Sequence, residues 1–426
     1  MKETIFKDLS INADSTYDCT GCSVCKVVCP VEDCISLPLN KDGFIEALSN
    51  ADTCIQCGKC QKVCYKFHDV DPFNFNTHQE TYVSTNKDKD IQYKSSSGGI
   101  VTALCKVALA DGYTILGATF DIENNRVKHI QVNKEEDLYK IRGSKYFNSI
   151  CYEEFSQIKK HKKYLVIGTP CQIGGLKKFF DRKKGYEQVI TVDFRCFGVA
   201  GYNLLDKYVD HIQENITTSK IKKLNMRSKA INWQRWGVEI DFEDGSKYYK
   251  DKFDDLFAMS FRSGQAVHEV CQTCTIYQNG IPSDIRVEDA WAFVNEQTGS
   301  NLKNGTSQVG IFSDKGRLLF EKVKELLILQ EVEYDYSVPR NRQLSDNKLF
   351  LSKLSDDMTP LQNIVDEYLQ NHPKEKRTFV WQYLNTLWYY KHFVRYWPKK
   401  PKDIFISIAV FFKMDLKWIL KKRFTK

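Results

Sequence analysis

Two cysteine-rich stretches, CTGCSVCKVVCP (19–30) and CIQCGKCQKVCY (54–65), decide the fold of the first part of this chain. In each stretch, three cysteines are spaced three positions apart and a fourth follows four positions later. The second stretch repeats the first at an offset of 35 residues. This spacing lets one tight loop present three thiolates to a single iron–sulfur cluster. We therefore expect a small metal-binding module at this end of the chain.

The spacing resembles that of bacterial ferredoxins with two four-iron clusters, in which the fourth cysteine of each stretch binds the cluster of the other. One cluster is then expected on Cys19, Cys22, Cys25 and Cys64, and the other on Cys54, Cys57, Cys60 and Cys29. The alternative is a pair of zinc knuckles. Zinc sites more often use two Cys-x2-Cys pairs or include histidine, so the third cysteine of each stretch favours iron.

The composition is typical of a globular protein of two or three domains. The chain has 426 residues, of which 42% are hydrophobic and 27% charged, and it contains 15 cysteines. The first residues, MKETIFKDLS, lack the apolar core of a signal peptide. No apolar run approaches the roughly 18 residues of a membrane-spanning helix. We therefore expect a cytoplasmic protein whose thiols bind metal rather than form disulfides.

The positive charge is concentrated at the C-terminal end. The net charge is +8, but residues 371–426 carry 14 Lys/Arg and 3 Asp/Glu, which leaves −3 for the rest. Within this segment, residues 403–424 (DIFISIAVFFKMDLKWILKKRF) indicate an amphipathic helix. Such a helix could make a peripheral contact with an anionic membrane, or it could pack on the acidic body of the protein. We expect no nucleic-acid binding, because the aromatic residues fall on an apolar helix face.

The middle of the chain alternates between strand and helix patterns, which is typical of a mixed α/β domain. Strands are expected at 81–87, 113–121, 127–132, 164–170 and 189–196, and helices at 100–112, 172–184 and 203–216. Residues 236–250 alternate around Asp244-Gly245 and indicate a hairpin. Residues 65–80 show no periodicity and resemble a linker, and the pattern turns helical beyond about residue 346.

Two glycine turns in this domain are candidates for binding an anionic cofactor. Residues 95–99 (SSSGG) precede a helix, where serine can cap the helix and glycine lets backbone amides approach a phosphate. Residues 143–146 (GSKY) offer a lysine and an aromatic ring. An ordinary capped helix and a surface turn would have the same sequences, so each motif alone leaves the alternatives open.

Four further cysteines could hold a third cluster. Cys171 follows Thr169-Pro170 at a strand-to-helix junction, and Cys196 ends the next strand. The pair Cys271-x2-Cys274 lies in a loop, where it could equally bind zinc, form a redox disulfide or arise by chance. Four thiolates suffice for one more cluster. The three cysteines that remain are expected to be buried, and they are Cys34, Cys105 and Cys151.

Several of these motifs, taken in order, resemble the β-subunit family of coenzyme F-420-dependent hydrogenases and dehydrogenases. The segments that carry the resemblance are SSSGGIVTAL (95–104), RGSKYFNS (142–149), GTPCQIGGL (168–176), DFRCFGV (193–199), CQTC (271–274), SDIRVEDAW (283–291) and GTSQVGIFSDKGRLLF (305–320). The match extends over roughly residues 80–345. The last 80 residues have no counterpart in it.

The resemblance implies a bound FAD and a four-iron cluster in this domain. It assigns the cluster to Cys171, Cys196, Cys271 and Cys274, and it makes Ser97, Gly98, Gly99, Thr102, Lys145 and Tyr146 candidate flavin contacts. Glu288 stands where the family often has glycine, which puts use of the deazaflavin coenzyme in doubt. Lys145 and Glu288 are candidate proton donors, and the catalytic residues are otherwise unknown.

The expected fold is a small dicluster ferredoxin domain (1–67), a linker (68–80), a mixed α/β FAD-binding domain with a third cluster (81–345) and a helical, basic and aromatic extension (346–426). The expected function is electron transfer between clusters and FAD, coupled to reduction or oxidation of an organic substrate or a deazaflavin. Ferredoxin or another redox protein is the expected partner. Two alternatives remain, an electron-transfer subunit that feeds a partner enzyme and a zinc-binding scaffold without catalytic activity.

Overall fold

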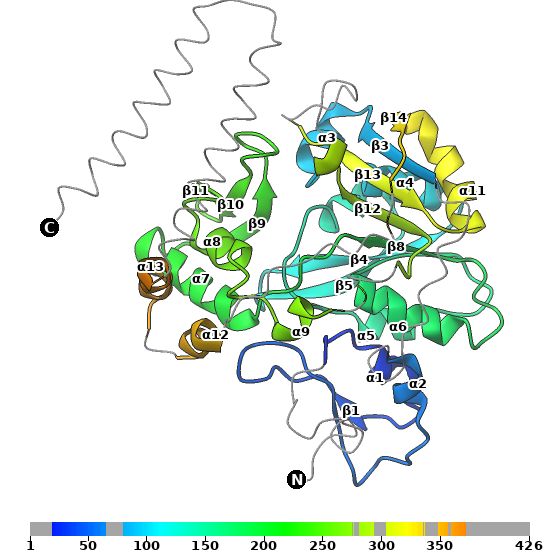
Figure 1. Cartoon of the computed structure of the whole chain (residues 1–426), viewed down its shortest axis with the longest axis horizontal. Coiled ribbons are helices and arrows are strands. Elements are labelled where there is room, and N and C mark those ends of the chain that lie inside the picture. Colours follow the sequence, from blue (N-terminus) through cyan, green and yellow to red (C-terminus); the bar gives the residue numbers. More distant parts are fainter. Residues whose placement is uncertain are drawn as a thin grey trace, which may run out of the picture. The chain divides into compact units, whose positions relative to one another are not determined.

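The computed structural model describes residues 19–64, 80–274, 276, 281–293, 304–334, 336, 348–356 and 359–371. The chain divides into two compact units, Met1–Tyr368 and Leu369–Lys426, and almost all described residues belong to the first. Figure 1 shows the elements of this unit along the sequence. None of the helices in the described ranges is long and apolar enough to cross a membrane.

The N-terminal module repeats its local geometry as well as its sequence. Helices α1 (Val24–Val28) and α2 (Lys59–Val63) each end at the fourth cysteine of a stretch, and β1 (Ile35–Ser36) pairs with β2 (Leu48–Ser49). The residues that precede the two helices, Ser23 and Gly58, have φ values of 65° and 67°. Such left-handed conformations are uncommon for a residue with a side chain, and they bend each loop sharply before its helix begins.

A nine-stranded mixed sheet forms the centre of the main domain, which agrees with the expected α/β class. Its strand order is β14-β3-β13-β12-β8-β7-β4-β5-β6. Their bounds are β14 (Leu327–Glu331), β3 (Glu80–Asn86), β13 (Ser307–Ile311), β12 (Ile285–Asp289), β8 (Val189–Phe194), β7 (Tyr164–Ile167), β4 (Thr114–Asp121), β5 (Arg126–Val132) and β6 (Ser149–Ile150). Strands β4, β7, β8 and β12 run parallel, so their carboxyl ends meet at one edge.

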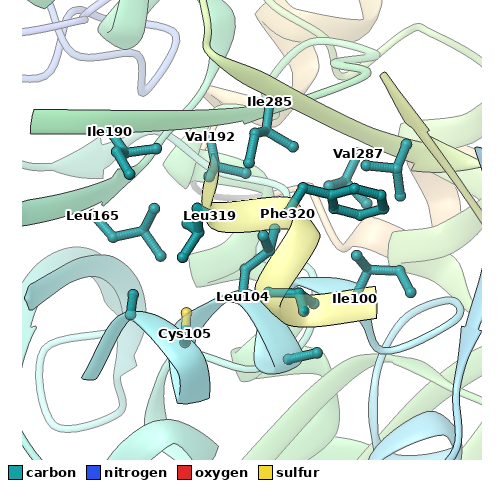
Figure 2. Packing of buried hydrophobic residues seen from close by; sticks show 14 of the residues in the cluster. Ile100, Leu104, Cys105, Leu165, Ile190, Val192, Ile285, Val287, Leu319 and Phe320 are labelled. Atoms are coloured by element: carbon teal, nitrogen blue, oxygen red, sulfur yellow. The ribbon is translucent and has the colours of Figure 1, made fainter. Parts of the chain in front are cut away.

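Two hydrophobic cores cover opposite faces of this sheet. Helices α4 (Ile100–Ala110) and α11 (Asp314–Val323) pack on one face, where Leu104 and Phe320 are fully buried (Figure 2). Helices α5 (Tyr152–Ser156) and α6 (Pro170–Phe180) pack on the other face. Neighbouring strand residues such as Leu165 and Val166 belong to different cores, as the alternation of side chains along a strand requires.

The core beneath α6 also contains side chains from the N-terminal module. Val24 and Val63 pack there with Ile173 and Leu176. A Cβ atom added to Gly175 of α6 would lie only 2.8 Å from Cγ2 of Val24. In Figure 1, α1 and α2 accordingly lie beside α6. The N-terminal module therefore docks on the main domain through a close-packed contact that needs a glycine.

A smaller antiparallel sheet lies outside the main one. It consists of β9 (Ile221–Ser228), β10 (Gly237–Phe242) and β11 (Lys247–Asp251), with β10 in the middle. The expected hairpin is confirmed in β10 and β11, whereas no sequence pattern had indicated β9. The neighbouring helices are α7 (Tyr202–Asn215) and α8 (Leu256–Arg262).

The remaining elements are short, apart from one helix near the end of the described chain. They are α3 (Lys89–Lys94), α9 (Glu269–Gln272), α12 (Lys348–Leu354), α13 (Leu361–Asn371) and the 3-10 helices η1 (Glu135–Lys140), η2 (Trp291–Phe293) and η4 (Lys324–Leu326). Helices α12 and α13 agree with the helical pattern expected beyond residue 346. The expected amphipathic helix at 403–424 and most of the linker lie outside the described residues.

Candidate functional site

Seven of the eight N-terminal cysteines fall into two neighbouring groups, and the eighth, Cys57, is assigned by its place in the repeat. Cys64 lies beside Cys22 and Cys25, and the thiol of Cys19 also lies close to Cys25, so that each of these neighbours raises a thiol pKa. Cys60 has Cys29 and Cys54 as its neighbours in the same way. We call Cys19, Cys22, Cys25 and Cys64 the first thiol set, and Cys29, Cys54, Cys57 and Cys60 the second thiol set.

Backbone amides point at equivalent sulfur atoms in the two loops. The amide of Gly21 lies 3.4 Å from Sγ of Cys19, and the amide of Gln56 lies 3.3 Å from Sγ of Cys54. Gly21 and Gln56 have φ values of 66° and 51°, and this left-handed turn is what directs the amide back to the sulfur. Amides directed at sulfur stabilise the thiolate form that a cluster requires.

A third group of cysteines lies at the edge where the parallel strands end. Cys171 is in the first turn of α6 after β7, Cys196 follows β8, and Cys271 is in α9. Cys196 and Cys274 both raise the pKa of Cys171 and of Cys271, in addition to the larger effect of burial. We call Cys171, Cys196, Cys271 and Cys274 the central thiol set.

The spacing of these thiols bears on the kind of metal centre that they could hold. Within the described ranges, no three His, Cys, Asp or Glu side chains are close enough to share one ion. Four cysteines that bind one zinc ion all place their sulfur about 2.3 Å from the same atom. Four cysteines that bind a four-iron cluster each bind a different iron, so their sulfur atoms lie further from one another. Burial raises the pKa of Cys22, Cys25 and Cys171, so bare thiolates would be costly there. Iron would supply the compensating positive charge.

The first thiol set lies against the central thiol set. After burial, the strongest influence on the pKa of Cys22 is Cys171 of the other set. Side chains of the main domain also donate hydrogen bonds to the loop of the first set. Nε2 of His268 lies 3.0 Å from the carbonyl oxygen of Cys19, and Nδ2 of Asn148 lies 2.9 Å from that of Thr20. The two sets therefore share one interface.

The two candidate cofactor turns are in contact with each other. The hydroxyl oxygens of Ser96 and Ser144 are 2.9 Å apart, and the amide of Ser144 donates to Ser96 Oγ. The hydroxyl of Ser97 donates to Thr306, and the amide of Gly98 donates to Ser307. These bonds bring the SSSGG and GSKY motifs, 48 residues apart in sequence, to one place.

The expectation that serine caps the helix after this turn was wrong. The residue before α4 is Gly99, whose φ of 84° is left-handed, and it makes no side-chain capping bond. Ser96 and Ser97 instead bind neighbouring loops, and the Ser95 hydroxyl donates back to the carbonyl oxygen of Ile91 in the preceding helix. Thr102 is buried in the first turn of α4.

Lys145 is a cation without an acidic partner among the contacts of the described chain. Its ammonium group donates to the carbonyl oxygen of Arg142 at 3.0 Å, and burial lowers its pKa to about 7. The pKa of Arg142 is also lowered by burial. A buried cation next to the Ser96–Ser144 contact favours an anionic ligand there. The ring of Tyr146 packs against Phe261 at 4.6 Å.

Lys229 was not identified from the sequence, although it holds the SSSGG turn in place. Its ammonium group donates to the carbonyl oxygens of Gln92, Ser97 and Asn304 at 2.6, 2.8 and 2.5 Å. Lys229 is the residue directly after β9, and it belongs to no recognisable sequence motif. Only the approach of three distant carbonyl groups in the folded chain reveals its role.

Glu288 is a buried carboxylate with two hydrogen-bond partners. Its carboxylate accepts hydrogen bonds from Arg195 at 2.7 Å and from Gln308 at 3.0 Å. The side chain is 3% exposed. Arg195 therefore balances the negative charge that Glu288 adds to this part of the sheet.

One segment, residues 143–151, connects the Ser96–Ser144 contact with the loop of the first thiol set. Ser144 contacts Ser96, and the carbonyl oxygen of Tyr146 accepts from Ala200, four residues after Cys196. Asn148 binds the loop of the first thiol set, and Sγ of Cys151 lies 3.5 Å from the carbonyl oxygen of Cys22. Cys151 itself is buried, as are Cys34 and Cys105, in agreement with expectation.

Known proteins similar to this chain were found by sequence and by structure. An uncharacterized protein of Methanocaldococcus jannaschii is 24% identical over 264 residues, which cover 53% of this chain and 71% of that protein. A chain from the coenzyme F-420-reducing nickel–iron hydrogenase complex of Methanosarcina barkeri is 20% identical, with a TM-score of 0.41. That match covers 72% of this chain and 95% of the other.

Two models of one family match successive parts of the sequence. The N-terminal part of the coenzyme F-420 hydrogenase/dehydrogenase beta subunit matches residues 81–152, and its C-terminal part matches residues 161–336. Both the candidate cofactor turns and the central thiol set lie within the matched residues. The chain therefore belongs to the coenzyme F-420 hydrogenase/dehydrogenase beta-subunit family, a family of oxidoreductase subunits.

Proposed function

We propose that the protein is an iron–sulfur flavoprotein oxidoreductase with three four-iron clusters and one FAD. The observation that carries this proposal is the shared interface of the first and central thiol sets, which residues 143–151 connect to the Ser96–Ser144 contact. Iron–sulfur clusters exchange single electrons, and a bound FAD supplies two-electron chemistry. An oxidoreductase that joins the two needs its cluster ligands and its flavin site side by side.

The side chains of this site have separate roles in the proposal. The three thiol sets hold the clusters, and Ser96, Ser97 and Gly98 form the turn against which FAD binds. Lys229 fixes the shape of that turn by binding three backbone carbonyl groups. Lys145 compensates the negative charge of the diphosphate. Gly99 and Thr102 belong to the same turn and helix start, and Tyr146 borders it.

A second function is supported by the family itself, which is named for a beta subunit. The protein could be an electron-transfer subunit that feeds a partner enzyme and has no substrate of its own. The two functions differ in turnover. An independent enzyme reduces a small organic substrate or the deazaflavin coenzyme alone, whereas the subunit does so only with its partner. Glu288 stands where the family often has glycine, but its negative charge is balanced by Arg195. The pair is neutral overall, so this substitution does not by itself repel an anionic coenzyme.

The composition of anaerobically purified protein tests the proposal. We expect about twelve iron and twelve sulfide per chain, because each of three clusters contains four of each, together with one FAD. About eight iron and no flavin would limit the protein to a ferredoxin-like module and would contradict the proposal for the main domain. Zinc in place of iron would contradict electron transfer altogether.

The affinity for FAD should decrease as the pH rises. The pKa of Lys145 is about 7 before a ligand binds, so the ammonium form that attracts a diphosphate is lost above this pH. We expect binding about tenfold weaker at pH 8 than at pH 6. Flavin fluorescence during titration of the deflavinated protein measures this change. In Lys145→Met the affinity should be low and nearly independent of pH.

The matched control is Lys163→Met, which removes an exposed lysine just before β7, where it donates to the carbonyl oxygen of Asp111. This variant should keep the wild-type pH dependence. An unchanged pH dependence in Lys145→Met would show that the lysine does not face the diphosphate.

A further inference from the structure

The two cysteine stretches are related by sequence and geometry, but their surroundings differ. Thr20 and Val24 of the first stretch are 6% and 1% exposed, because they face the main domain. The equivalent residues of the second stretch, 35 positions later, are Ile55 and Lys59. Ile55 is 64% exposed, and Lys59 and Cys57 are exposed as well. One loop of the repeat is thus covered by this chain, and the other faces solvent.

We propose that the exposed loop around Ile55, Gln56 and Cys57 is the surface on which a separate one-electron carrier protein docks. This inference rests on the proposed function, because it requires a cluster on the second thiol set. The carrier would donate one electron to that cluster, so that the carrier is oxidised by one electron and the cluster is reduced by one. Transfer in the opposite direction uses the same surface. No bond is formed or broken.

The order of the thiol sets supports this position for the carrier. The first thiol set adjoins the central thiol set through Cys22 and Cys171, and its loop is bound by His268 and Asn148. It therefore occupies an internal position. The second thiol set adjoins the first, since Cys60 raises the pKa of Cys25, and its Cys57 is exposed. Electrons from outside consequently meet the second set before the other two.

The chemistry of the loop favours a protein carrier that makes an apolar contact. Residues 53–58 (TCIQCG) contain no charged side chain, and the exposed side chain at their centre is isoleucine. At the equivalent position of the first stretch, the residue is threonine, and its carbonyl oxygen binds Asn148. Burial of an aliphatic side chain beneath a partner stabilises a docked complex.

The test compares reduction of the intact protein by two reductants of different size. The probes are a reduced bacterial ferredoxin, as a protein carrier, and reduced methyl viologen, as a small molecule. Cluster bleaching in a stopped-flow spectrophotometer gives both rate constants. In Ile55→Glu we expect the second-order rate constant with ferredoxin to fall about tenfold, while the rate with methyl viologen stays the same.

The matched control is Leu318→Glu, which places the same charge at another apolar residue that is 70% exposed on α11. Both rates should stay at the wild-type value in this variant. An unchanged ferredoxin rate in Ile55→Glu would overturn the docking surface, and so would equal slowing with both reductants. Absence of iron from the wild-type protein would instead overturn the proposed function, so the two failures are distinguishable.

Discussion

Cys171→Ala is expected to remove one cluster and leave two. Iron should fall from about twelve to about eight per chain, because a four-iron cluster that loses one of its four thiolates is no longer held firmly. Cys171 lies among Cys196, Cys271 and Cys274, and its thiol is also within 3.0 Å of the Thr169 hydroxyl. Iron and sulfide analysis, together with the electron paramagnetic resonance spectrum of the reduced protein, measures the loss.

The same variant should interrupt electron flow to the flavin. The first and second thiol sets would still be reduced by ferredoxin. The flavin absorbance should bleach at least about a hundredfold more slowly, because the proposed route to the flavin passes through the central thiol set, which adjoins the first thiol set. Unchanged iron content in Cys171→Ala would contradict the ligand assignment of the central thiol set.

Cys105→Ala is the matched control, because Cys105 is also a buried cysteine. It lies in α4, packed among aliphatic side chains of the core in Figure 2, and burial alone raises its pKa. Removing its sulfur leaves a small cavity that should lower the free energy of unfolding by about 1 kcal/mol. The iron content should not change.

The sequence predicted the local features of the site well. Several of these features depend only on residues nearby in the sequence. They are the positions of the thiols, the strands that end before Cys171 and Cys196, and the helix that follows residue 99. The same is true of the hairpin at β10 and β11, where Asp244-Gly245 favours a tight turn. Spacing and periodicity describe interactions over a few residues, so they suffice for these elements.

Contacts between distant segments could not be predicted in this way. Three such contacts join residues that are 75 to 249 positions apart. They are the contact of Val24 with Gly175, the bond of His268 to Cys19 and the bonds of Lys229 to three carbonyl groups. Nothing in the spacing of either segment specifies its partner. The failed prediction of a serine cap has the same origin, because Ser97 and its neighbours bind loops that are remote in sequence.

Gly175→Leu is expected to separate the first thiol set from the central thiol set. Even a Cβ at this position would meet Cγ2 of Val24 at 2.8 Å and its Cβ at 3.0 Å, and both helices lie in a packed core. A leucine must push α1 away from α6, and overpacking of this kind costs about 1–3 kcal/mol. Because α1 begins two residues after Cys22, the displacement weakens the contact between Cys22 and Cys171.

The readout is the magnetic interaction that the proposed function predicts between two reduced clusters. It should broaden the electron paramagnetic resonance spectrum of the wild type and diminish in Gly175→Leu. Iron content should stay near about twelve per chain, since no ligand is changed. The pair Gly175→Ala and Val24→Ala provides the matched control. The first change alone adds the clashing Cβ. The second removes both methyl groups that it meets, including the nearest atom at 2.8 Å, and leaves the Val24 Cβ at 3.0 Å. The double variant should therefore recover most of the interaction that Gly175→Ala weakens. An interaction of wild-type strength in Gly175→Leu would mean that electrons pass between the two thiol sets without help from this helix contact.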